Sequence, residues 1–300
     1  MTVADLIKRY IEEKAQKGRR QMGKSQAYTL KLLARSAIGK VQAAKLMAID
    51  FIDHCTVRRA AGIQPATIKQ DMTFLVIVLK HAENIWEIEG VSLAAWNKAK
   101  TQLANEQLIA KSRPRTRRPK LEELERIEAF FRSRNEDPRT KIPMDVITRF
   151  SYLTARRISE TCRLRRGDVN LEKRTCIVRD LKNPKGKGEH GGFPLLGEAW
   201  DIVQERFKVI ADHPDARLFA YNSHSCSACY TDAKKKLGIA GLRLHDNRRE
   251  AISRMFERGF NVPEVAKLSL HKNPSMLLNV YTALKPEDLH LGPASQRLPT

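Results

Sequence analysis

Apolar residues recur at intervals of three and four through residues 1–110, the spacing that places them on one face of an α-helix. The pattern is present at Leu6–Ile11, again at Leu30–Ile38, and continues through Asp50–His54. Polar and charged residues fill the intervening positions. This part of the chain is therefore expected to consist of amphipathic helices.

The longest helical segment in this region is expected to run to Trp86, with Thr67 as its N-cap. Its β-branched residues between Thr73 and Val78 favour a strand locally. The length of the segment and its heptad-like apolar repeat instead favour a buried helix. Residues 1–110 thus predict a small all-α domain.

The pattern breaks at residues 111–120, which hold six basic residues and two prolines. Proline blocks helix continuation and like charges repel, so an extended linker is expected. It is either a solvated hinge or a strap that neutralises DNA phosphates. The basic character of the whole chain favours the strap, whose candidate DNA-binding residues are Arg113, Arg115, Arg117 and Arg118.

Residues 121–285 predict a second domain, mostly helical with one strand–turn–strand unit, followed by a tail at 286–300. Residues 174–181 and Phe193–Leu196 have strand character, and a turn rich in glycine and lysine joins them at 183–192. The fold class is therefore mainly α with a small antiparallel β-sheet. Helices are expected at Leu121–Arg134, Pro143–Leu153, 198–210, 225–237, 245–258, 262–269 and 274–283.

The composition of the chain indicates its size class and the kind of molecule it binds. The 300 residues exceed the usual size of a single core, which agrees with two domains. The net charge of +21 implies a polyanion, and nucleic acid is favoured over a membrane surface. No apolar run approaches eighteen residues and no cleavable leader is evident. A soluble, cytoplasmic protein that is neither secreted nor bound to a membrane is expected.

The five cysteines are odd in number and scattered, as is usual in a reducing compartment. Cys226 and Cys229 have metal-ligand spacing, and His224 lies nearby. A closed zinc site needs four ligands, usually including a second pair, and the chain has no second Cys-x-x-Cys. The two cysteines are interpreted as small apolar side chains on one helix face, and no metal site is expected.

Six residues have the chemistry that cutting a DNA strand without metal requires. A nucleophile must attack phosphorus, negative charge grows on the non-bridging oxygens, and the leaving sugar oxygen needs a proton. Fixed donors aimed at such oxygens contribute on the order of 3 kcal/mol each, and arginine can bind two oxygens at once without losing its charge. The six residues are Arg157, Lys182, His245, Arg248, His271 and Tyr281.

Three blocks in this set resemble the tyrosine recombinase (phage integrase) family over about residues 120–285. They are Thr154-Ala-Arg-Arg-Ile-Ser-Glu160, His245-Asp-Asn-Arg248, and His271 with Tyr281 ten residues later. The Arg-x-x-Glu spacing selects Arg157 over its neighbour Arg156. Two positions depart from the family pattern, since Ala155 and Leu270 stand where the family usually has glycine.

The resemblance implies a mechanism that uses neither metal nor ATP and no other cofactor. Tyr281 would attack the phosphate, with His245 as base, to give a 3′-phosphotyrosine link. Arg157, Arg248 and His271 would stabilise the transition state, and Glu160 would orient its neighbours. Lys182, at the end of the predicted strand, would protonate the leaving 5′ oxygen. Lys185 and Lys187 on the same turn remain alternatives for this role.

The resemblance also implies a site-specific recombinase, bacterial or phage-encoded and nucleoid-associated, that integrates, excises or inverts DNA. Residues 1–110 would be the family's helical (SAM-like) core-binding domain, with no further domain before it. The partners would be double-stranded recombination sites, a tetramer of the protein on two sites, and accessory DNA-bending proteins. A type IB topoisomerase and a non-enzymatic DNA-binding regulator remain alternatives. The target sequence and the direction of recombination cannot be predicted from these residues.

Overall fold

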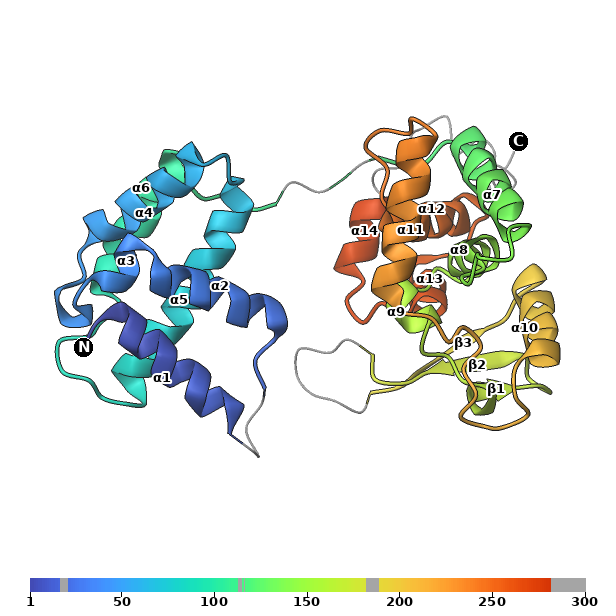
Figure 1. Ribbon diagram of the computed structural model, residues 1–300, viewed down its shortest axis with the longest axis horizontal. Helices are drawn as coiled ribbons and strands as arrows, with labels where there is room; N and C mark the ends of the chain where they lie inside the picture. Colours follow the sequence, from blue (N-terminus) through green and yellow to red (C-terminus); the bar gives the residue numbers. More distant parts are fainter. Residues whose placement is uncertain (17–20, 113–114, 116, 182–188, 282–300) are drawn as a thin grey trace, which may run out of the picture. The chain divides into compact units, whose positions relative to one another are not determined.

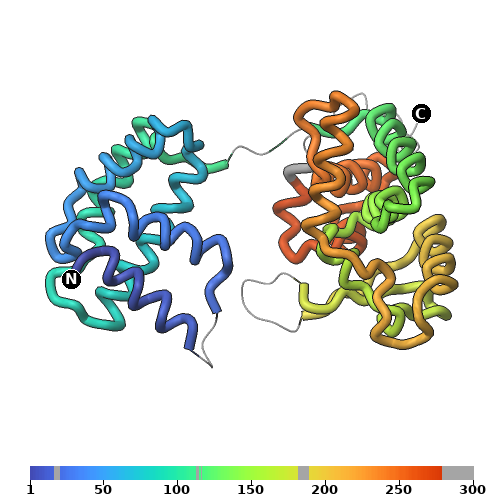
Figure 2. Tube along the Cα trace, viewed as in Figure 1, coloured from blue at the N-terminus to red at the C-terminus, as the bar shows by residue number. Residues whose placement is uncertain are grey.

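The basic segment after residue 110 marks the division of the chain into two compact units, Met1–Pro114 and Arg115–Thr300. The computed structural model describes residues 1–16, 21–112, 115, 117–181 and 189–281, with side chains up to residue 278 (Figures 1 and 2). Over these residues no helix is long and apolar enough to cross a membrane.

Every helix or strand named within the described residues of unit 1 is a helix. Within each helix, apolar side chains at three- and four-residue spacing point into one shared core. Leu6, Leu33, Phe51 and Leu75, each from a different helix, are completely buried there. The elements are α1 (Val3–Ala15), α2 (Lys24–Arg35), α3 (Ala37–Lys40), the short η1 (Ala43–Lys45), α4 (Ala48–Ala60), α5 (Pro65–Asn84) and α6 (Ala94–Asn105).

The long helix α5 packs against α1, α2 and α4 and includes Thr73–Val78, the β-branched segment whose residues favour a strand locally. Its predicted cap was wrong. Gln64 is the N-cap and Pro65 occupies the first turn, so Thr67 lies inside the helix. Proline suits that place because its fixed φ is helical and its missing N–H would have had no partner there.

Unit 2 combines helices with a small sheet (Figure 1). Its helices before the sheet are α7 (Leu121–Asn135), α8 (Met144–Leu153), α9 (Ile158–Thr161) and η2 (Arg166–Asp168). The sheet comprises β1 (Val169–Asn170), β2 (Thr175–Val178) and β3 (Gly191–Pro194). The helices after it are α10 (Glu198–Val209), α11 (Ser223–Lys236), α12 (Leu244–Glu257), α13 (Val262–Ser269) and α14 (Ser275–Tyr281).

The sheet is antiparallel in the order β1-β2-β3, with Cys176 opposite Phe193. Strand β1 was not anticipated, because two residues carry no alternating pattern. The bounds of the last strand were also wrong, since β3 begins at Gly191 and ends at Pro194. Gly191 can pair with Val178 because it lacks a Cβ. A Cβ there would lie 2.9 Å from side-chain carbons of Leu181 and Leu270.

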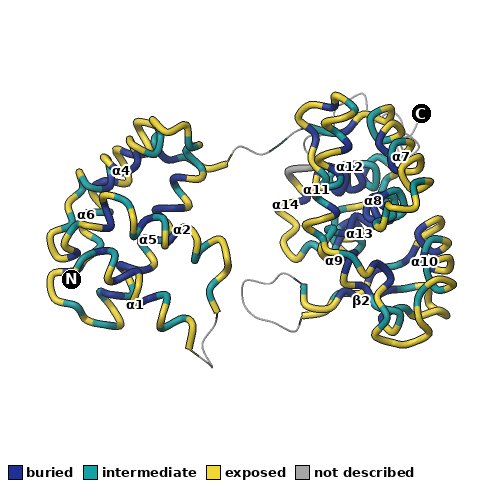
Figure 3. The backbone as a smooth tube through the Cα atoms, viewed as in Figure 1, coloured by how far each residue is buried: buried dark blue, intermediate teal, exposed yellow. Residues whose placement is uncertain are grey.

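Two cores hold unit 2 together. The larger one joins α7, α8, α10, α11 and one face of the sheet. The smaller one joins the turn after α8 to three helices, through Ala155, Ile252 of α12, Val265 of α13 and Leu277 of α14. Figure 3 shows the buried residues concentrated along α8, α12 and α13. The segments that carry the candidate blocks are therefore brought together by burial.

Both positions that depart from the family's glycines adopt left-handed backbone conformations. Ala155 has φ +51° in the turn after α8, and Leu270 has φ +54° at the end of α13. Glycine reaches this region freely, whereas a residue with a Cβ is strained there by roughly 1–2 kcal/mol. The chain therefore carries backbone strain at both turns.

This strain leads us to expect opposite outcomes for two alanine-to-glycine substitutions. Ala228→Gly, at an exposed position inside α11, should lower the free energy of unfolding by about 1 kcal/mol, the usual cost of glycine in a helix. Ala155→Gly should leave it unchanged to within about 0.5 kcal/mol, because relief of strain offsets the extra freedom of the unfolded chain. Urea denaturation measures both, and equal losses would contradict the left-handed assignment.

Candidate functional site

The turn between α8 and α9 presents Arg157 at the edge of unit 2. Arg157 is the N-cap of α9, and a third of its side chain remains exposed. The preceding Ala155 is completely buried in the smaller core, which fixes the turn. The backbone of Arg157 is thus fixed by the buried turn, while part of its side chain stays exposed to solvent.

Glu160 is the buried carboxylate of the cluster, with 2% of its side chain exposed. Its Oε1 accepts a hydrogen bond from Nη1 of Arg157 at 2.6 Å, and its Oε2 accepts one from the backbone N–H of Arg157 at 3.1 Å. Nη1 of Arg248 lies 3.7 Å from Oε2. Burial raises the pKa of Glu160, but the neighbouring arginines outweigh it and lower the pKa below its usual value. Glu160 is therefore an ionised orienting group.

Arg248 lies on α12 and is buried, with 3% of the residue exposed. Its Nη1 donates to the carbonyl of Ala155, and its Nη2 donates to the carbonyl of Ser269 at 2.9 Å. Burial, with Arg157 and Arg156 nearby, lowers the pKa of Arg248 to about 9. One side chain thus connects α12 to the turn before α9 and to the end of α13.

His271 follows the left-handed Leu270 and lies against Arg248, with its Nε2 3.1 Å from Nη2 of Arg248. Oγ of Ser269 donates to the carbonyl of Val265 at 2.6 Å and lies 2.6 Å from Nδ1 of His271. Because a hydroxyl has a single proton, Ser269 accepts from Nδ1–H, and Nε2 is left unprotonated. Burial and the arginines lower the pKa of His271 to about 3.

His245 is in the first turn of α12, three residues before Arg248 and on a neighbouring part of the same helix face. The residue is exposed, yet partial shielding from water and the charges of Arg248 and Arg157 lower the pKa of His245 below its ordinary value. The imidazole is therefore neutral near pH 7, with a lone pair available to accept a proton.

Tyr281 is the last residue of α14, a helix that packs against α12 and α13 through the buried Leu277. Its side chain lies outside the described part of the structure. The helix backbone reaches the group of elements that carry His245, Arg248 and His271.

Lys182, Lys185 and Lys187 all lie outside the described residues. The base of their turn is described, and there the N–H of Leu181 donates to the carbonyl of Glu189 at 2.8 Å. Leu270, the neighbour of His271, packs over Gly191 beside Leu181. Lys272 forms an ion pair with Glu189. The described residues on either side of this segment, Leu181 and Glu189, therefore lie near the two neighbours of His271 in the chain.

The basic segment contacts carboxylates of unit 2. Arg117 pairs with Glu123 of α7 at 2.6 Å, while Arg115 and Arg118 pair with Asp246 and Glu250 of α12 at 2.9 Å and 2.7 Å. Arg113 lies outside the described residues. Three of the four arginines that the sequence assigned to DNA are thus bound within the protein.

Two residues of the site were missed. Arg156, set aside as the neighbour of Arg157, is 1% exposed and donates to the carbonyls of Thr154, at 3.0 Å, and Leu268. Its guanidinium lies 4.5 Å from the centre of the Phe193 ring. Ser269 fixes the ring of His271. A serine two residues before the histidine was a weak signal, and nothing in the sequence distinguished a buried arginine from an exposed one.

The cluster carries an unbalanced charge. Within the described residues, three guanidiniums (Arg156, Arg157 and Arg248) surround one carboxylate, Glu160, while His271 is neutral. An excess of two positive charges near the protein surface is suited to an anion, and an arginine with an exposed guanidinium suits a phosphate oxygen.

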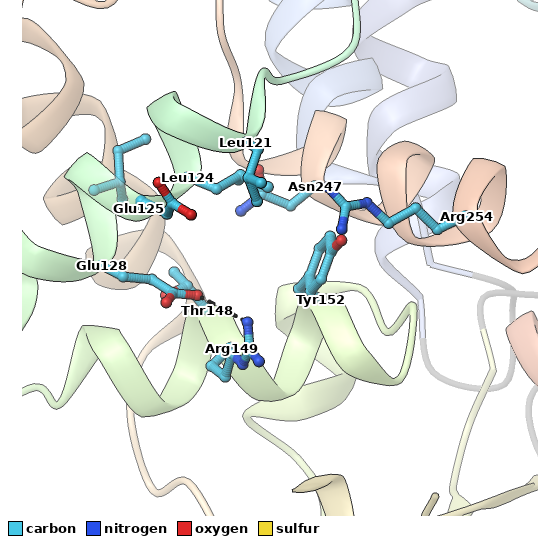
Figure 4. Close-up of a pocket in the computed structure, with 10 residues that line it drawn as sticks. Leu121, Leu124, Glu125, Glu128, Thr148, Arg149, Tyr152, Asn247 and Arg254 are labelled. Atoms are coloured by element: carbon cyan, nitrogen blue, oxygen red, sulfur yellow. Dashed lines mark hydrogen bonds and ion pairs between the residues drawn. The ribbon is translucent and has the colours of Figure 1, made fainter. Parts of the chain in front are cut away.

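A separate cavity of about 190 Å³ opens between α7, α8 and α12 (Figure 4). It is lined by Leu124, Arg149, Tyr152, Asn247 and Arg254, among others, and the guanidinium of Arg254 lies over the Tyr152 ring. Neither the arginines nor the histidines of the cluster line it, so it is distinct from the candidate site.

The described residues contain no group of three histidine, cysteine or acidic side chains placed to hold a metal ion. Cys226 and Cys229 both lie on α11, where Cys226 is buried with its sulfur 4.0 Å from that of Cys162.

Two curated proteins match more than two thirds of the chain. A putative integrase/recombinase of Haemophilus influenzae (strain ATCC 51907 / DSM 11121 / KW20 / Rd) is 33% identical over 208 residues, which are 69% of this chain and 66% of that protein. A shufflon-specific DNA recombinase of Escherichia coli is 29% identical over 247 residues, 79% of this chain and 58% of that protein. The chain thus spans less than two thirds of the length of either relative.

Among solved structures, the Tn1549 transposon integrase in complex with transposon right end DNA has the same fold. The TM-score is 0.71 at 17% identity, over 96% of this chain and 97% of that one. The phage integrase family model matches residues 120–288, a range that includes the turn before α9, α12, α13 and α14. Because this match covers more than half of the chain and every element of the site, the protein belongs to the phage integrase family.

Proposed function

We propose that this protein is a site-specific DNA recombinase, which cuts and rejoins DNA strands through a 3′-phosphotyrosine intermediate to integrate, excise or invert DNA. The observation that carries the proposal is the convergence of Arg157 and Arg248 on Glu160 and His271, with α14 ending in Tyr281 on the same core. The excess positive charge there suits a phosphodiester.

Each residue has a role in the proposed reaction. Arg157 and Arg248 hold the non-bridging oxygens, whose charge grows as the phosphorus is attacked. The neutral His245 accepts the proton of Tyr281, which forms the new bond to phosphorus. The 5′ oxygen leaves with a proton from a lysine of the 182–188 turn. The phosphotyrosine ester conserves the energy of the broken bond, so religation by a 5′ hydroxyl needs no ATP.

His271 contributes as a neutral group. With Nδ1–H bonded to Ser269, its Nε2 lies against Arg248 and orients that guanidinium. Glu160 does the same for Arg157 from the other side. We propose that these two residues limit the rotation of the arginines, so that little reorganisation is needed when charge develops.

The wider assembly is part of the proposal. Unit 1, whose helices include many basic residues, would bind duplex DNA as a core-binding domain. Complete recombination cuts two duplexes on both strands and therefore needs four tyrosines, which favours a tetramer of the protein on two DNA sites. Accessory DNA-bending proteins would help to bring distant sites together.

Tyr281→Phe should abolish covalent linkage to DNA while leaving DNA affinity within about twofold, since only a hydroxyl is removed. The probe is a nicked duplex taken from the DNA flanking the gene, and denaturing electrophoresis detects the protein–DNA adduct. Tyr221→Phe, a partly buried tyrosine in the larger core, is the matched control and should form the adduct at the wild-type rate. Adduct formation by Tyr281→Phe would rule out the proposed nucleophile.

A single lysine of the turn should be the general acid. Alanine at Lys182, Lys185 or Lys187 is expected to slow cleavage by about 10²–10⁴-fold at the residue that donates the proton. A substrate with sulfur in place of the bridging 5′ oxygen has a leaving group that needs no proton, so it should restore the rate of that variant alone. We expect the rescued residue to be Lys182, and rescue of Lys185→Ala or Lys187→Ala instead would reassign the role.

The low pKa of His271, about 3, predicts that the free protein loses stability as the pH falls below about 6.5. In that range the unfolded chain binds a proton at position 271 that the folded site does not, so His271 alone lowers the free energy of unfolding by at most about 1.4 kcal/mol per pH unit. His271→Asn should have a shallower slope between pH 5 and 6.5 in thermal or urea denaturation. Bound duplex DNA should also flatten the slope, because a phosphate stabilises the imidazolium. Identical slopes for the variant and the wild type would contradict this account of the site.

A further inference from the structure

Helix α12 presents two different faces. His245 and Arg248 lie on the face directed to the site. Asp246, Glu250 and Glu257, spaced four and seven residues apart, form an acidic face on the other side of the helix. The side chains of Asp246 and Glu250 are only 5% and 4% exposed. Two buried carboxylates therefore need partners behind the residues that are proposed to act on DNA.

Arg115 supplies the partner of Asp246. Its Nη2 lies 2.9 Å from Oδ2 and its Nε 3.3 Å from Oδ1, a two-pronged pairing. The same Nη2 donates to the carbonyl of Gly241 at 2.6 Å, just before the helix. Asp246 also caps α12, since it accepts from the N–H of Arg243 at 2.8 Å. Arg115 thus fixes the N-terminal turn that contains His245.

Arg118 supplies the partner of the other two carboxylates. Its Nε lies 2.7 Å from Oε2 of Glu250, and its Nη1 lies 2.6 Å from Oε1 of Glu257. Burial opposes the charge of Arg118, but the hydrogen bonds to these two glutamates outweigh it and raise its pKa. Glu250 is also bound by Arg254 at 2.8 Å. Arg118 thus spans two turns of α12 from behind.

We propose that Arg115 and Arg118 are positioning residues that clasp the acidic face of α12 and thereby hold His245 and Arg248 in place, an inference that rests on the proposed function. Both sit in the basic segment that the sequence suggested as a strap on DNA phosphates. Carboxylates this deeply buried are costly without a partner. The segment that follows the helical unit is therefore bonded to the helix that carries two of the reacting residues.

The salt dependence of DNA binding shows whether Arg115 and Arg118 clasp the acidic face of α12 or bind DNA phosphates. The logarithm of the association constant falls with the logarithm of salt concentration by about 0.9 per phosphate contacted. Arg118→Gln and Arg115→Gln in the full chain should leave this slope unchanged on a fluorescent duplex. The same variants should form the covalent adduct at least about tenfold more slowly, as expected when reacting groups are displaced. A reduced slope with an unchanged cleavage rate would overturn the clasp.

Two further comparisons guard against a merely unfolded variant. Arg118→Lys keeps one charge and should recover part of the cleavage rate. Adding Glu250→Gln to Arg118→Gln removes a buried carboxylate that Arg254 alone would be left to balance. Hydrogen exchange of α12 amides should therefore be faster in Arg118→Gln and slower again in the double variant. Additive effects of the two substitutions would contradict the clasp.

Lys111→Gln is the matched control for loss of one positive charge from the same segment, and it should not change α12 exchange. The exchange and salt measurements require no cleavage. If the wild-type protein forms no adduct with any duplex, the proposed function fails, while these two readouts still decide whether the clasp exists.

Discussion

The buried guanidinium of Arg248 is the contact on which the site depends. It is a charge placed where water cannot solvate it, and its donors are taken up by two backbone carbonyls from separate segments. Carbonyls satisfy hydrogen bonds but do not neutralise charge, and the nearest carboxylate, Glu160, is shared with Arg157. The positive potential is thereby retained at the candidate site instead of being cancelled.

The backbone conformations around Arg248 follow from this arrangement. The carbonyl that accepts its Nη1 belongs to Ala155, and the carbonyl that accepts its Nη2 precedes Leu270. Both Ala155 and Leu270 are left-handed, although neither is glycine. Local strain of this kind persists where surrounding packing compensates for it, and here the smaller core and the larger core each bury one of the two turns. The two strained residues therefore lower the stability of the fold, but they lie at or next to the backbone carbonyls that accept hydrogen bonds from Arg248.

Local spacing in the sequence indicated part of the candidate site. Contacts between residues far apart in the chain could not be predicted in this way. The Arg-x-x-Glu and His-x-x-Arg intervals select residues that share a helix or a turn, so Arg157, Glu160, His245 and Arg248 could be chosen from the sequence. The carboxylate partners of Arg115 and Arg118 lie 131 and 132 residues away, and no local pattern encodes such pairings. Burial of Arg156 likewise depends on Phe193 and Leu268, which come from other elements.

Within the fold, the helices of both units followed from apolar periodicity, but short elements did not. The strand β1 has too few residues for an alternating pattern, and the start of β3 at two glycines has no side chains to reveal it. Thr67 was a reasonable cap by composition, yet Pro65 two residues earlier already suited the first turn. The choice of Lys182 over Lys185 and Lys187 stays a prediction, because all three lie outside the residues that the structure describes.

The packing of Leu270 over Gly191 couples two positions by volume. A leucine fills the space above the strand, and the strand remains in register only because position 191 has no side chain. Neither residue can be exchanged independently, since a larger group at 191 would push the hairpin away from His271, and a smaller one at 270 would leave a void between them. Relatives with glycine at the position of Leu270 are therefore free to carry a bulkier residue at the position of Gly191. Side-chain sizes at these two positions should vary inversely among relatives.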